Sequence, residues 1–453
     1  MKPTNKQSQQ LSKLLQKWNN LRTRNETRSA YYAGEERFRS YGIGLPPKMA
    51  AQAKSVIGWP SKTVDMLADL TVFRGYEAVD DSDTATQEWL DDLVRRSKLT
   101  TTVSQAVVSA YTHGCSFLTV AGGADGRPTI IPRSALWSVG VWDSVSQWLS
   151  AVMTIDAVQS GTSSPTQVTV HERGKSTVFV QGAMGWDATE YTHAPMMLTA
   201  YPIVCNPSLD RPLGVARLDR QVMGLTMAAW RTVMRMECTA EYYSSPHLWL
   251  VGTAEDFDPG SGENRWSALQ NAINSITKDD QGHTPTLQQI AQATMTPHAD
   301  MIKSLALLLS ADTDIPPEAL GIDRSNPTSA DALAAMERRL SRKADRQNIL
   351  FGTSLEQAAR DAAAIEGVEL GAFRAVFEPT RETSLAARVD AFSKLAGTTP
   401  AYVQTREAWT SLGYSSDEAN QIVRRVRAAD TTQALSSLFG GNADPATPQI
   451  EQE

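Results

Sequence analysis

Residues 321–352 read GIDRSNPTSADALAAMERRLSRKADRQNILFG, a polar loop followed by a long segment with helical spacing. The loop ends in Asn-Pro-Thr-Ser, where proline cannot continue a preceding helix and a Thr or Ser hydroxyl can cap the next one. Apolar side chains then recur at helical spacing at Ala332, Leu333, Met336, Leu340, Ala344 and Ile349. The other side of this expected helix is basic and carries Arg338, Arg339, Arg342, Lys343 and Arg346. The pattern predicts a loop and a basic helix face, which is either solvated or presented to a large polyanion.

A short apolar helix and a proline corner precede this loop. The helix contains Leu305, Leu307, Leu308 and Leu309, and residues 315–321, IPPEALG, close it. The order of helix, P-P-x-x-L-G corner, loop and Arg-rich helix ending in FG resembles the portal proteins of tailed bacteriophages. In that family the loop lines the DNA tunnel. The resemblance therefore implies a DNA-facing tunnel loop made of Asp323, Arg324, Ser325, Asn326, Pro327, Thr328 and Ser329.

Matches to the same family occur in the right order over roughly residues 10–420. Residues 31–34, YYAG, followed by LPP at 45–47, resemble the family's opening Y-Y-x-G segment, and residues 59–75 resemble its V-D-x-L-A-x-x-x-x-F-R-G helix and turn. Residues 212–214, PLG, then a long helix and SPHLWLVG at 245–252 are similar to its G-x-S, helix, A-P-x-x-W-x-x-G run. The chain thus resembles the family over most of its length.

Composition describes an ordinary water-soluble chain with more than one structural unit. At 453 residues the chain exceeds what one core usually serves, so roughly two to four units are expected. It has 41% hydrophobic and 21% charged residues. It contains no apolar run of about eighteen residues and begins with a polar segment, which argues against membrane and secretory classes. The three cysteines are isolated and are expected to be reduced, buried thiols.

The net charge of -7 is unusual for a protein that grips DNA, because such proteins normally carry a basic excess. A conduit through which DNA slides has a different requirement, and an acidic body with local basic patches suits it. Residues 1–40 are basic and residues 253–300 are acidic. This asymmetry is compatible with a conduit.

The N-terminal half predicts an antiparallel β region inside a helical frame, an α+β fold. Helices are expected at 8–33, 59–73, 83–97 and 101–112, and strands at 116–120, 128–132, 151–155, 166–172, 176–181 and 197–200. Residues 174–177, GKST, contain the core of a phosphate-binding loop, but its first glycine is missing and a strand follows instead of a helix. We therefore expect a hairpin turn there and no ATPase.

The C-terminal half predicts long helices separated by an acidic excursion. A helix at 216–244 would be roughly 40 Å long, and its two apolar stripes indicate neighbours on two sides. Short strands and turns then fill 247–297, and the acidic residues of this excursion are Asp256, Asp258, Glu263, Asp279 and Asp280. A strand is expected at 373–377, where it could join the earlier β region, and helices at 385–395, 405–412 and 417–427. Disorder is expected beyond about 440.

The resemblance implies a portal fold with a division into named parts. These parts are a wing (1–215), a stem helix (216–246), a clip (247–296), a second stem helix (297–320), a tunnel loop (321–330), a tunnel helix with a strand returning to the wing (331–380), an α-helical crown (381–430) and a flexible tail (431–453). From their charge, and not from the resemblance, we expect the five acidic residues of the excursion to form a docking surface on the clip. The basic helix face would contact either DNA or a neighbouring subunit.

No catalytic or metal-binding pattern occurs in the sequence. The six histidines lack ligand spacing, and neither G-x-S-x-G nor H-E-x-x-H is found, so no cofactor, no metal site and no enzyme activity are expected. His113, at a helix end, fits a capping role better than that of a base.

Two functions are therefore compatible with the sequence. The resemblance implies a ring, dodecameric in the family, at one capsid vertex of the virion. Double-stranded DNA would be packaged and ejected through it, and it would assemble in the host cytoplasm. The partners implied are the terminase large subunit, the major capsid protein and scaffold, and a head-tail connector, with no membrane. The alternative is a DNA-binding adaptor or DNA-processing enzyme that grips phosphates with the basic helix 338–346.

Overall fold

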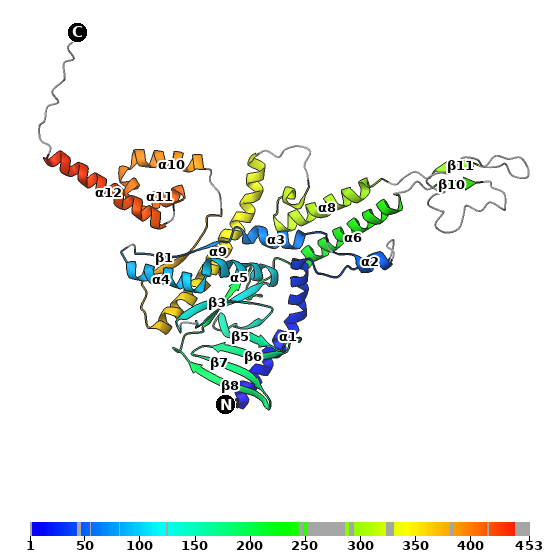
Figure 1. Ribbon diagram of the computed structural model, residues 1–453, viewed down its shortest axis with the longest axis horizontal. Helices are drawn as coiled ribbons and strands as arrows, with labels where there is room; N and C mark the ends of the chain where they lie inside the picture. Colours follow the sequence, from blue (N-terminus) through cyan, green and yellow to red (C-terminus); the bar gives the residue numbers. More distant parts are fainter. Residues whose placement is uncertain are drawn as a thin grey trace, which may run out of the picture. The chain divides into compact units, whose positions relative to one another are not determined.

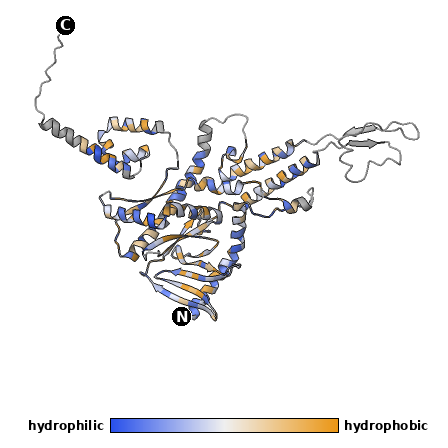
Figure 2. Ribbon diagram, in the orientation of Figure 1, coloured by the Kyte–Doolittle hydropathy of each residue, from blue (hydrophilic) through white to orange (hydrophobic). Residues whose placement is uncertain are grey.

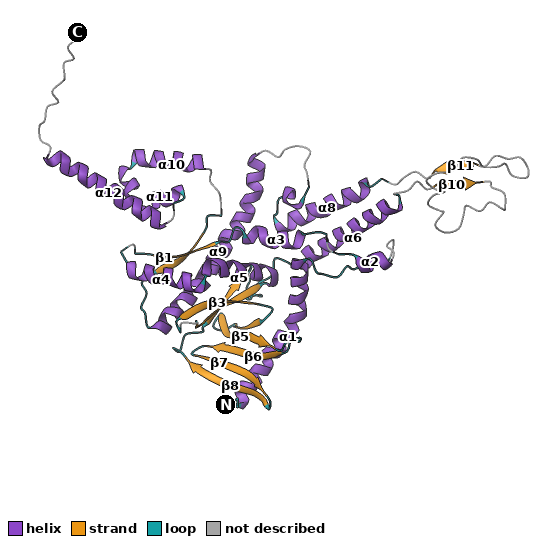
Figure 3. Cartoon of the chain, in the orientation of Figure 1, coloured by secondary structure: helices purple, strands orange, loops and turns teal. Residues whose placement is uncertain are grey.

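The computed structural model describes residues 2–42, 47–54, 56–80, 82–123, 126–243, 248–251, 286–289, 294–322, 330–380, 385–414 and 416–439. The chain divides into two compact units, Met1–Thr380 and Arg381–Glu453. The larger unit contains both helices and strands, with β2 to β9 following one another along the chain, and the smaller unit is helical in its described part (Figure 3). The mixed helix and sheet architecture confirms the predicted α+β class.

The N-terminal helix α1 (Asn5–Ala33) packs on a five-stranded antiparallel sheet (Figure 1). Its start is fixed by a capping box, in which the Thr4 backbone N–H donates to the Gln7 side chain at 2.8 Å and the Gln7 N–H donates to the Thr4 hydroxyl at 3.3 Å. The sheet has the order β4 (Ser138–Asp143), β5 (Trp148–Val158), β6 (Pro165–Glu172), β7 (Lys175–Gly182), β8 (Gly185–Thr192). The apolar stripe of α1 and the inner face of this sheet together form a separate core.

A second core surrounds a three-stranded sheet. In it β2 (Cys115–Gly122) lies between β3 (Pro128–Ser134) and β9 (Ala200–Val204), and both pairings are antiparallel. Helices α3 (Trp59–Ala68), α4 (Thr84–Ser97) and α5 (Leu99–His113) pack around it, and α4 is capped by Asp83, whose side chain accepts from the Thr86 N–H at 3.0 Å. This sheet and its helices are the frame on which the C-terminal helices of the same unit rest.

Helix α9 (Ala330–Glu366) is the longest helix, about 55 Å at 1.5 Å per residue. Its expected end at Phe351-Gly352 was wrong, because the helix continues through both residues. A Cβ on Gly352 would meet only ordinary contacts, Ala375 and Phe377 at 3.6 and 3.7 Å. Beyond Gly352 the buried face consists mainly of alanines, whose small side chains let the helix lie close to the sheet. Strand β12 (Phe373–Phe377) then returns and pairs antiparallel with β1 (Phe73–Ala78).

Helices α6 (Arg220–Tyr242) and α8 (Thr296–Thr313) lie side by side (Figure 1). Apolar residues recur along both of them (Figure 2). Both apolar stripes predicted for α6 contain buried side chains, among them Val222, Ala229 and Trp230. Strands β10 (Leu248–Val251) and β11 (Thr286–Gln289) form an antiparallel pair, and the short helix α2 (Pro47–Gln52) follows the first loop.

The C-terminal unit contains α10 (Leu385–Thr398), the 3-10 turn η2 (Pro400–Gln404), α11 (Arg406–Leu412) and α12 (Ser416–Phe439). The Phe392 and Trp409 rings, 5.4 Å apart, pack at its centre, and the Trp409 indole N–H donates to the Val403 carbonyl at 2.8 Å. Helix α12 continues to Phe439 and so includes residues for which a flexible tail was expected. Residues beyond Phe439 lie outside the described part of the chain.

Several expected elements need correction. The second predicted helix ends at Ala68, and the expected helical residue Phe73 starts strand β1, a strand too short to show a period. Strands β4 and β8 were missed, because β4 is short and β8 is mostly exposed and therefore polar. The strand expected at 197–200 lies at Ala200–Val204. Helix α6 begins at Arg220 instead of 216, since Asp219 caps it.

Two further expectations changed in the folded chain, and a third is confirmed. Strand β12 pairs with β1 instead of joining the larger sheets. Of the three free cysteines, only Cys205 is fully buried, and Cys115 and Cys238 are partly exposed. The hairpin expected at GKST is confirmed, because Gly174 takes φ 78° between β6 and β7. Among the described helices, none has the length and apolar character that a membrane crossing requires.

Candidate functional site

The corner between α8 and α9 is built from the predicted P-P-x-x-L-G segment. Helix α8 ends at Thr313, its C-cap Asp314 takes the left-handed conformation with φ 59°, and the following Ile315 is buried. The Ser310 hydroxyl donates to the Ile315 carbonyl at 2.6 Å. Pro317–Leu320 then forms the 3-10 turn η1, which Gly321 ends with φ 83°. Helix α8 and the turn η1 are each followed by a residue with positive φ. These two residues fix the direction in which the chain enters the loop.

Asp314 binds two members of the predicted basic face. Its carboxylate lies 2.6 Å from the Lys343 ammonium and 3.6 Å from the Arg339 guanidinium, and its own side chain is only 16% exposed. Lys343 and Arg339 are four residues apart, so both reach the same point from one face of α9. The corner and the helix behind the loop are therefore joined by an ion pair within one subunit. Sequence reasoning missed Asp314, although its place beside IPPEALG was a usable signal.

The other three basic side chains point into solvent. Arg338, Arg342 and Arg346 are exposed, and no carboxylate of the described residues lies within ion-pair distance of them. Spaced by four residues, they form one stripe along about two turns of α9. The structure thus divides the predicted basic face into a paired edge and a solvent-exposed stripe.

The opposite face of α9 is buried and fixes the orientation of this stripe. Leu340, Ala344 and Phe351 are at most 3% exposed, and the Phe351 ring packs 6.0 Å from the Tyr111 ring of α5. The Ser354 hydroxyl donates to the Pro202 carbonyl of β9 at 2.6 Å. Ile349, predicted on the apolar side, is 73% exposed, because the helix turns it away from the sheet. Side chains of residues 330–336 lie outside the described part.

Arg217 links three elements beneath the corner, and the sequence did not single it out. Its guanidinium donates to the Thr313 carbonyl at the end of α8 at 2.8 Å and to the Thr63 carbonyl of α3. A cation at a helix C-terminus interacts favourably with the helix dipole. Burial lowers the pKa of Arg217 from its usual value, although it stays charged in the neutral range. The residue therefore holds the end of α8 against the frame of the larger unit.

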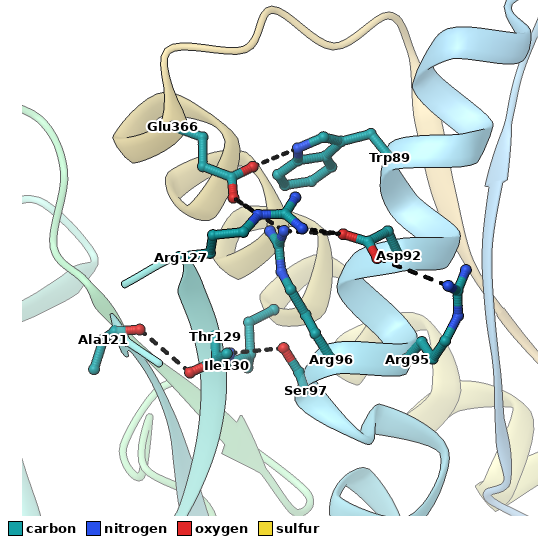
Figure 4. A network of polar contacts seen from close by, with 10 residues as sticks. All are labelled: Trp89, Asp92, Arg95, Arg96, Ser97, Ala121, Arg127, Thr129, Ile130 and Glu366. Carbon is teal, nitrogen blue, oxygen red and sulfur yellow. Dashed lines mark hydrogen bonds and ion pairs between the residues drawn. The ribbon is translucent and has the colours of Figure 1, made fainter. Parts of the chain in front are cut away.

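The far end of α9 is anchored by an ionic network (Figure 4). Glu366 accepts from the Trp89 indole at 2.6 Å and lies 2.9 Å from both Arg96 and Arg127. Asp92 completes the network, at 3.1 Å from Arg96 and 2.8 Å from Arg127. Burial alone would raise the pKa of Glu366, but hydrogen bonds from Arg127 and Trp89 and the charge of Arg96 outweigh it, and the pKa is lowered. The helix is thus held by charged contacts at both of its described ends.

The predicted loop and the predicted clip surface lie outside the described residues. The loop comprises Asp323, Arg324, Ser325, Asn326, Pro327, Thr328 and Ser329. The clip surface comprises Asp256, Asp258, Glu263, Asp279 and Asp280. The structure describes the segments on either side of the loop, which are the corner before it and helix α9 after it.

Three of the described histidines, His113, His171 and His193, form contacts with neighbouring residues. His113 ends α5, and its backbone carbonyl accepts from Arg28 at 2.7 Å, while burial lowers the pKa of its ring to about 4. Ser176 and His193 lie 2.8 Å apart, but no described carboxylate bonds to His193 to orient it as a base. No three His, Cys, Asp or Glu side chains gather as metal ligands in the part of the chain that the structure describes.

The comparisons with known proteins give the class of this chain. A sequence model of the family described as "Phage portal protein, SPP1 Gp6-like" matches residues 11–412. The chain therefore belongs to the phage portal protein family.

Two phage portal proteins and chains of known structure are similar to this chain. The portal protein of Mycobacterium phage L5 is 26% identical over 449 residues, covering 93% of this chain and 88% of that protein. The portal protein of Mycobacterium phage D29 gives the same values. Among solved structures, a chain in the neck of a native gene transfer agent particle, computed with C12 symmetry, matches with a TM-score of 0.45 at 12% identity, covering 86% of this chain and 99% of that one.

Proposed function

We propose that twelve copies of this chain form a ring at one vertex of a phage capsid, through which double-stranded DNA is packaged and later ejected. Membership of the portal family over residues 11–412 carries this proposal. The ring is part of the virion and assembles in the host cytoplasm. It performs no chemistry of its own, and ATP hydrolysis is supplied by a terminase that docks on it.

The described elements can be assigned to the parts of such a ring. The two sheets with α1, α3, α4 and α5 correspond to the wing (1–215), and α6 and α8 to the two stem helices (216–246 and 297–320). Residues 247–296 form the clip, on which the terminase large subunit and then a head-tail connector dock through the five acidic residues. The tunnel loop (321–330), α9 with β12 (331–380), the crown (381–430) and the tail (431–453) complete the assignment. The wing meets the major capsid protein and scaffold.

Apolar side chains left exposed on α8 support packing between copies. Met301, Leu307 and Leu308 are 43%, 48% and 57% exposed, although α6 already covers the other side of the helix. Exposed apolar groups along one helix face are typical of protein interfaces. Stem helices of neighbouring subunits would bury them.

The assignment of the loop to the tunnel is supported by the contacts that hold the two ends of the loop. In this proposal residues 321–330 of every subunit surround the DNA at the narrowest point. The corner with its left-handed Asp314 and Gly321, and the ion pair from Asp314 to Lys343, would hold both ends of the loop at a constant separation. A loop held in this way contacts DNA in passing and does not grip it.

One observation favours the second candidate, a DNA-binding adaptor or DNA-processing enzyme. The stripe formed by Arg338, Arg342 and Arg346 is exposed and could bind phosphates directly. Charge reversal at Arg342 and Arg346 separates the two functions. It should disturb the packing of subunits if the chain forms a portal, and should weaken DNA binding by the isolated chain if it is an adaptor.

Mass measurement of the purified chain tests the ring. Twelve copies of the 49.4 kDa chain amount to about 590 kDa. A stable monomer or dimer, even with scaffold and capsid protein present, would exclude a portal ring.

A further inference from the structure

A large basic cavity lies in the wing, away from the loop. It has a volume of about 840 Å³ and is bounded by α1, the end of α5, β4 and the start of α6. Five basic residues line it, namely Lys17, Arg24, Arg28, Arg211 and Arg220. Asp219 is the single acidic residue in the lining, and its carboxylate already caps α6 by accepting from Gln221 and Val222 at 2.8 and 2.9 Å. The cavity therefore carries a net positive charge.

The cationic groups of this cavity lack acidic partners. No described carboxylate forms an ion pair with any of the five. Lys17 and Arg28 instead donate to the backbone carbonyls of Gly140 at 3.0 Å and His113 at 2.7 Å. Nε of Arg28 and Nδ1 of His113 are buried without a hydrogen-bond partner among the described residues, and His113 is only 7% exposed. Burial and the neighbouring Arg24 lower the pKa of Arg28 to about 10, although the charge of Asp219 opposes this shift.

The walls between these charges are apolar, which narrows the class of ligand. Leu21, Val139, Trp142 and Leu213 also line the cavity. The volume is many times that of a single water molecule, about 30 Å³ in the liquid. A peptide that carries carboxylates beside an apolar side chain fits this combination better than a bare phosphate or a nucleic-acid backbone does.

The chain itself contains such a peptide. Residues 75–94 include seven acidic residues and no Lys or Arg. Within it Asp80 and Glu88 are exposed, and Val79 between β1 and α4 is 65% exposed. Neither Asp80 nor Glu88 forms an ion pair with a described residue. We call residues 79–88 the acidic segment.

The cavity and the acidic segment lie on opposite sides of the larger unit. Figure 1 shows β1 and α4 on one side of this unit and α1 with the start of α6 on the other. From the acidic segment the chain runs along α4, through Lys98 and then along α5, whose last residue, His113, lines the cavity. One copy therefore cannot bring its own acidic segment into its own cavity without unfolding. Two different surfaces on opposite sides form a head-to-tail contact, the kind that closes into a ring.

We propose that the basic cavity of each subunit binds the acidic segment of the next subunit, with Val79 among the apolar walls and the carboxylates of Asp80 and Glu88 beside the arginines. This inference rests on the proposed ring. It names the two surfaces that meet between neighbouring copies, which the family membership does not supply.

Zero-length cross-linking tests the contact directly. A carbodiimide joins an amine to a carboxylate that it touches, so we expect cross-links between the Lys17 peptide and the acidic segment. Mixed rings of 14N and 15N chains would show that the linked peptides come from different copies. Rings that yield no cross-link from Lys17 to the acidic segment contradict this contact and leave the ring proposal intact. A chain that stays monomeric in every preparation contradicts the ring and this contact together.

Charge reversal provides a second test that does not need a reactive lysine. Arg24→Glu and Glu88→Lys are each expected to raise the protein concentration needed for ring assembly at least tenfold. The double variant should restore assembly, because every interface then regains an opposite-charge pair. Arg173→Glu, at an exposed position between β6 and β7, makes the same change of charge away from both surfaces and should assemble as the parent chain does. Unchanged assembly of both single variants would overturn the proposal.

Discussion

Nζ of Lys343 lies 2.6 Å from Oδ2 of Asp314, so the helix behind the predicted tunnel loop is tied to the corner in front of it. Asp314 ends α8 with a positive φ, and Lys343 lies four residues beyond Arg339, the second cation on the same carboxylate. The loop between them is therefore closed at its base by a contact within one subunit. The Arg338, Arg342 and Arg346 stripe remains available for another partner.

Removing the charge of Asp314 should have a small and measurable effect. Asp314→Asn keeps a residue that tolerates the left-handed conformation. Because Lys343 is 40% exposed, we expect a loss of about 0.5–1 kcal/mol in the free energy of unfolding, decreasing at high salt. A double-mutant cycle with Lys343→Met, measured by denaturant unfolding, isolates the pair. A coupling energy of zero would show that the contact does not contribute.

Removing a buried side chain from α9 should lower the free energy of unfolding much more than removing the charge of Asp314 does. Phe351 is fully buried against Tyr111, and Phe351→Ala is expected to reduce the free energy of unfolding by about 3–5 kcal/mol. Ile349→Ala on the same helix is the matched control, because Ile349 is 73% exposed and should change stability by less than about 0.5 kcal/mol. Equal losses in the two variants would contradict the orientation of α9 described above.

The Glu366 network predicts a dependence of stability on pH. The folded chain holds the pKa of Glu366 below its ordinary value of 4.5, so its contribution is present above that pH and is lost as the pH falls through the lowered value. Glu366→Gln should cost about 1–3 kcal/mol near neutral pH, because hydrogen bonds to a charged acceptor are lost. Denaturant unfolding at several pH values should show the difference from the parent chain shrinking below 4.5. A difference that is constant with pH would exclude an ionised Glu366.

Substitutions in the loop should impair the handling of DNA without impairing the folding of the chain. Replacing Arg324, Ser325 and Asn326 with alanines changes no side chain of the described core. We expect unchanged thermal unfolding and ring mass, but reduced packaging and retention of DNA in particles assembled with the variant. Packaging and retention at parental levels would show that the loop does not line the tunnel.

The sequence predicted those elements whose signals are local. The apolar stripe of α1 predicted that helix, although its start was expected three residues too late, and a helix was predicted over the residues of α4. The pairing of β1 with β12 joins residues about 300 positions apart, so no short window contains it. The second half of α9 was missed because alanines such as Ala358 and Ala362 carry little hydropathy, although their small size is what lets the helix approach the sheet.

Only part of the site was predicted, because only part of it has a local signal in the sequence. The basic residues of α9 were visible as a run of like charge, and their order after the proline corner resembled the family. Their division into a paired edge and an exposed stripe depends on where Asp314 lies once the corner folds back. Arg217 was missed because its partners are backbone carbonyls, which carry no sequence signal.

Electron microscopy of the assembled chain, viewed along the symmetry axis, tests the ring most directly, because it gives the number of subunits and the width of the channel together. We expect twelve-fold symmetry and a central channel wide enough for double-stranded DNA, with residues 321–330 at its narrowest point. An assembly without a central channel, or a channel too narrow for a DNA duplex in every state observed, would contradict the account.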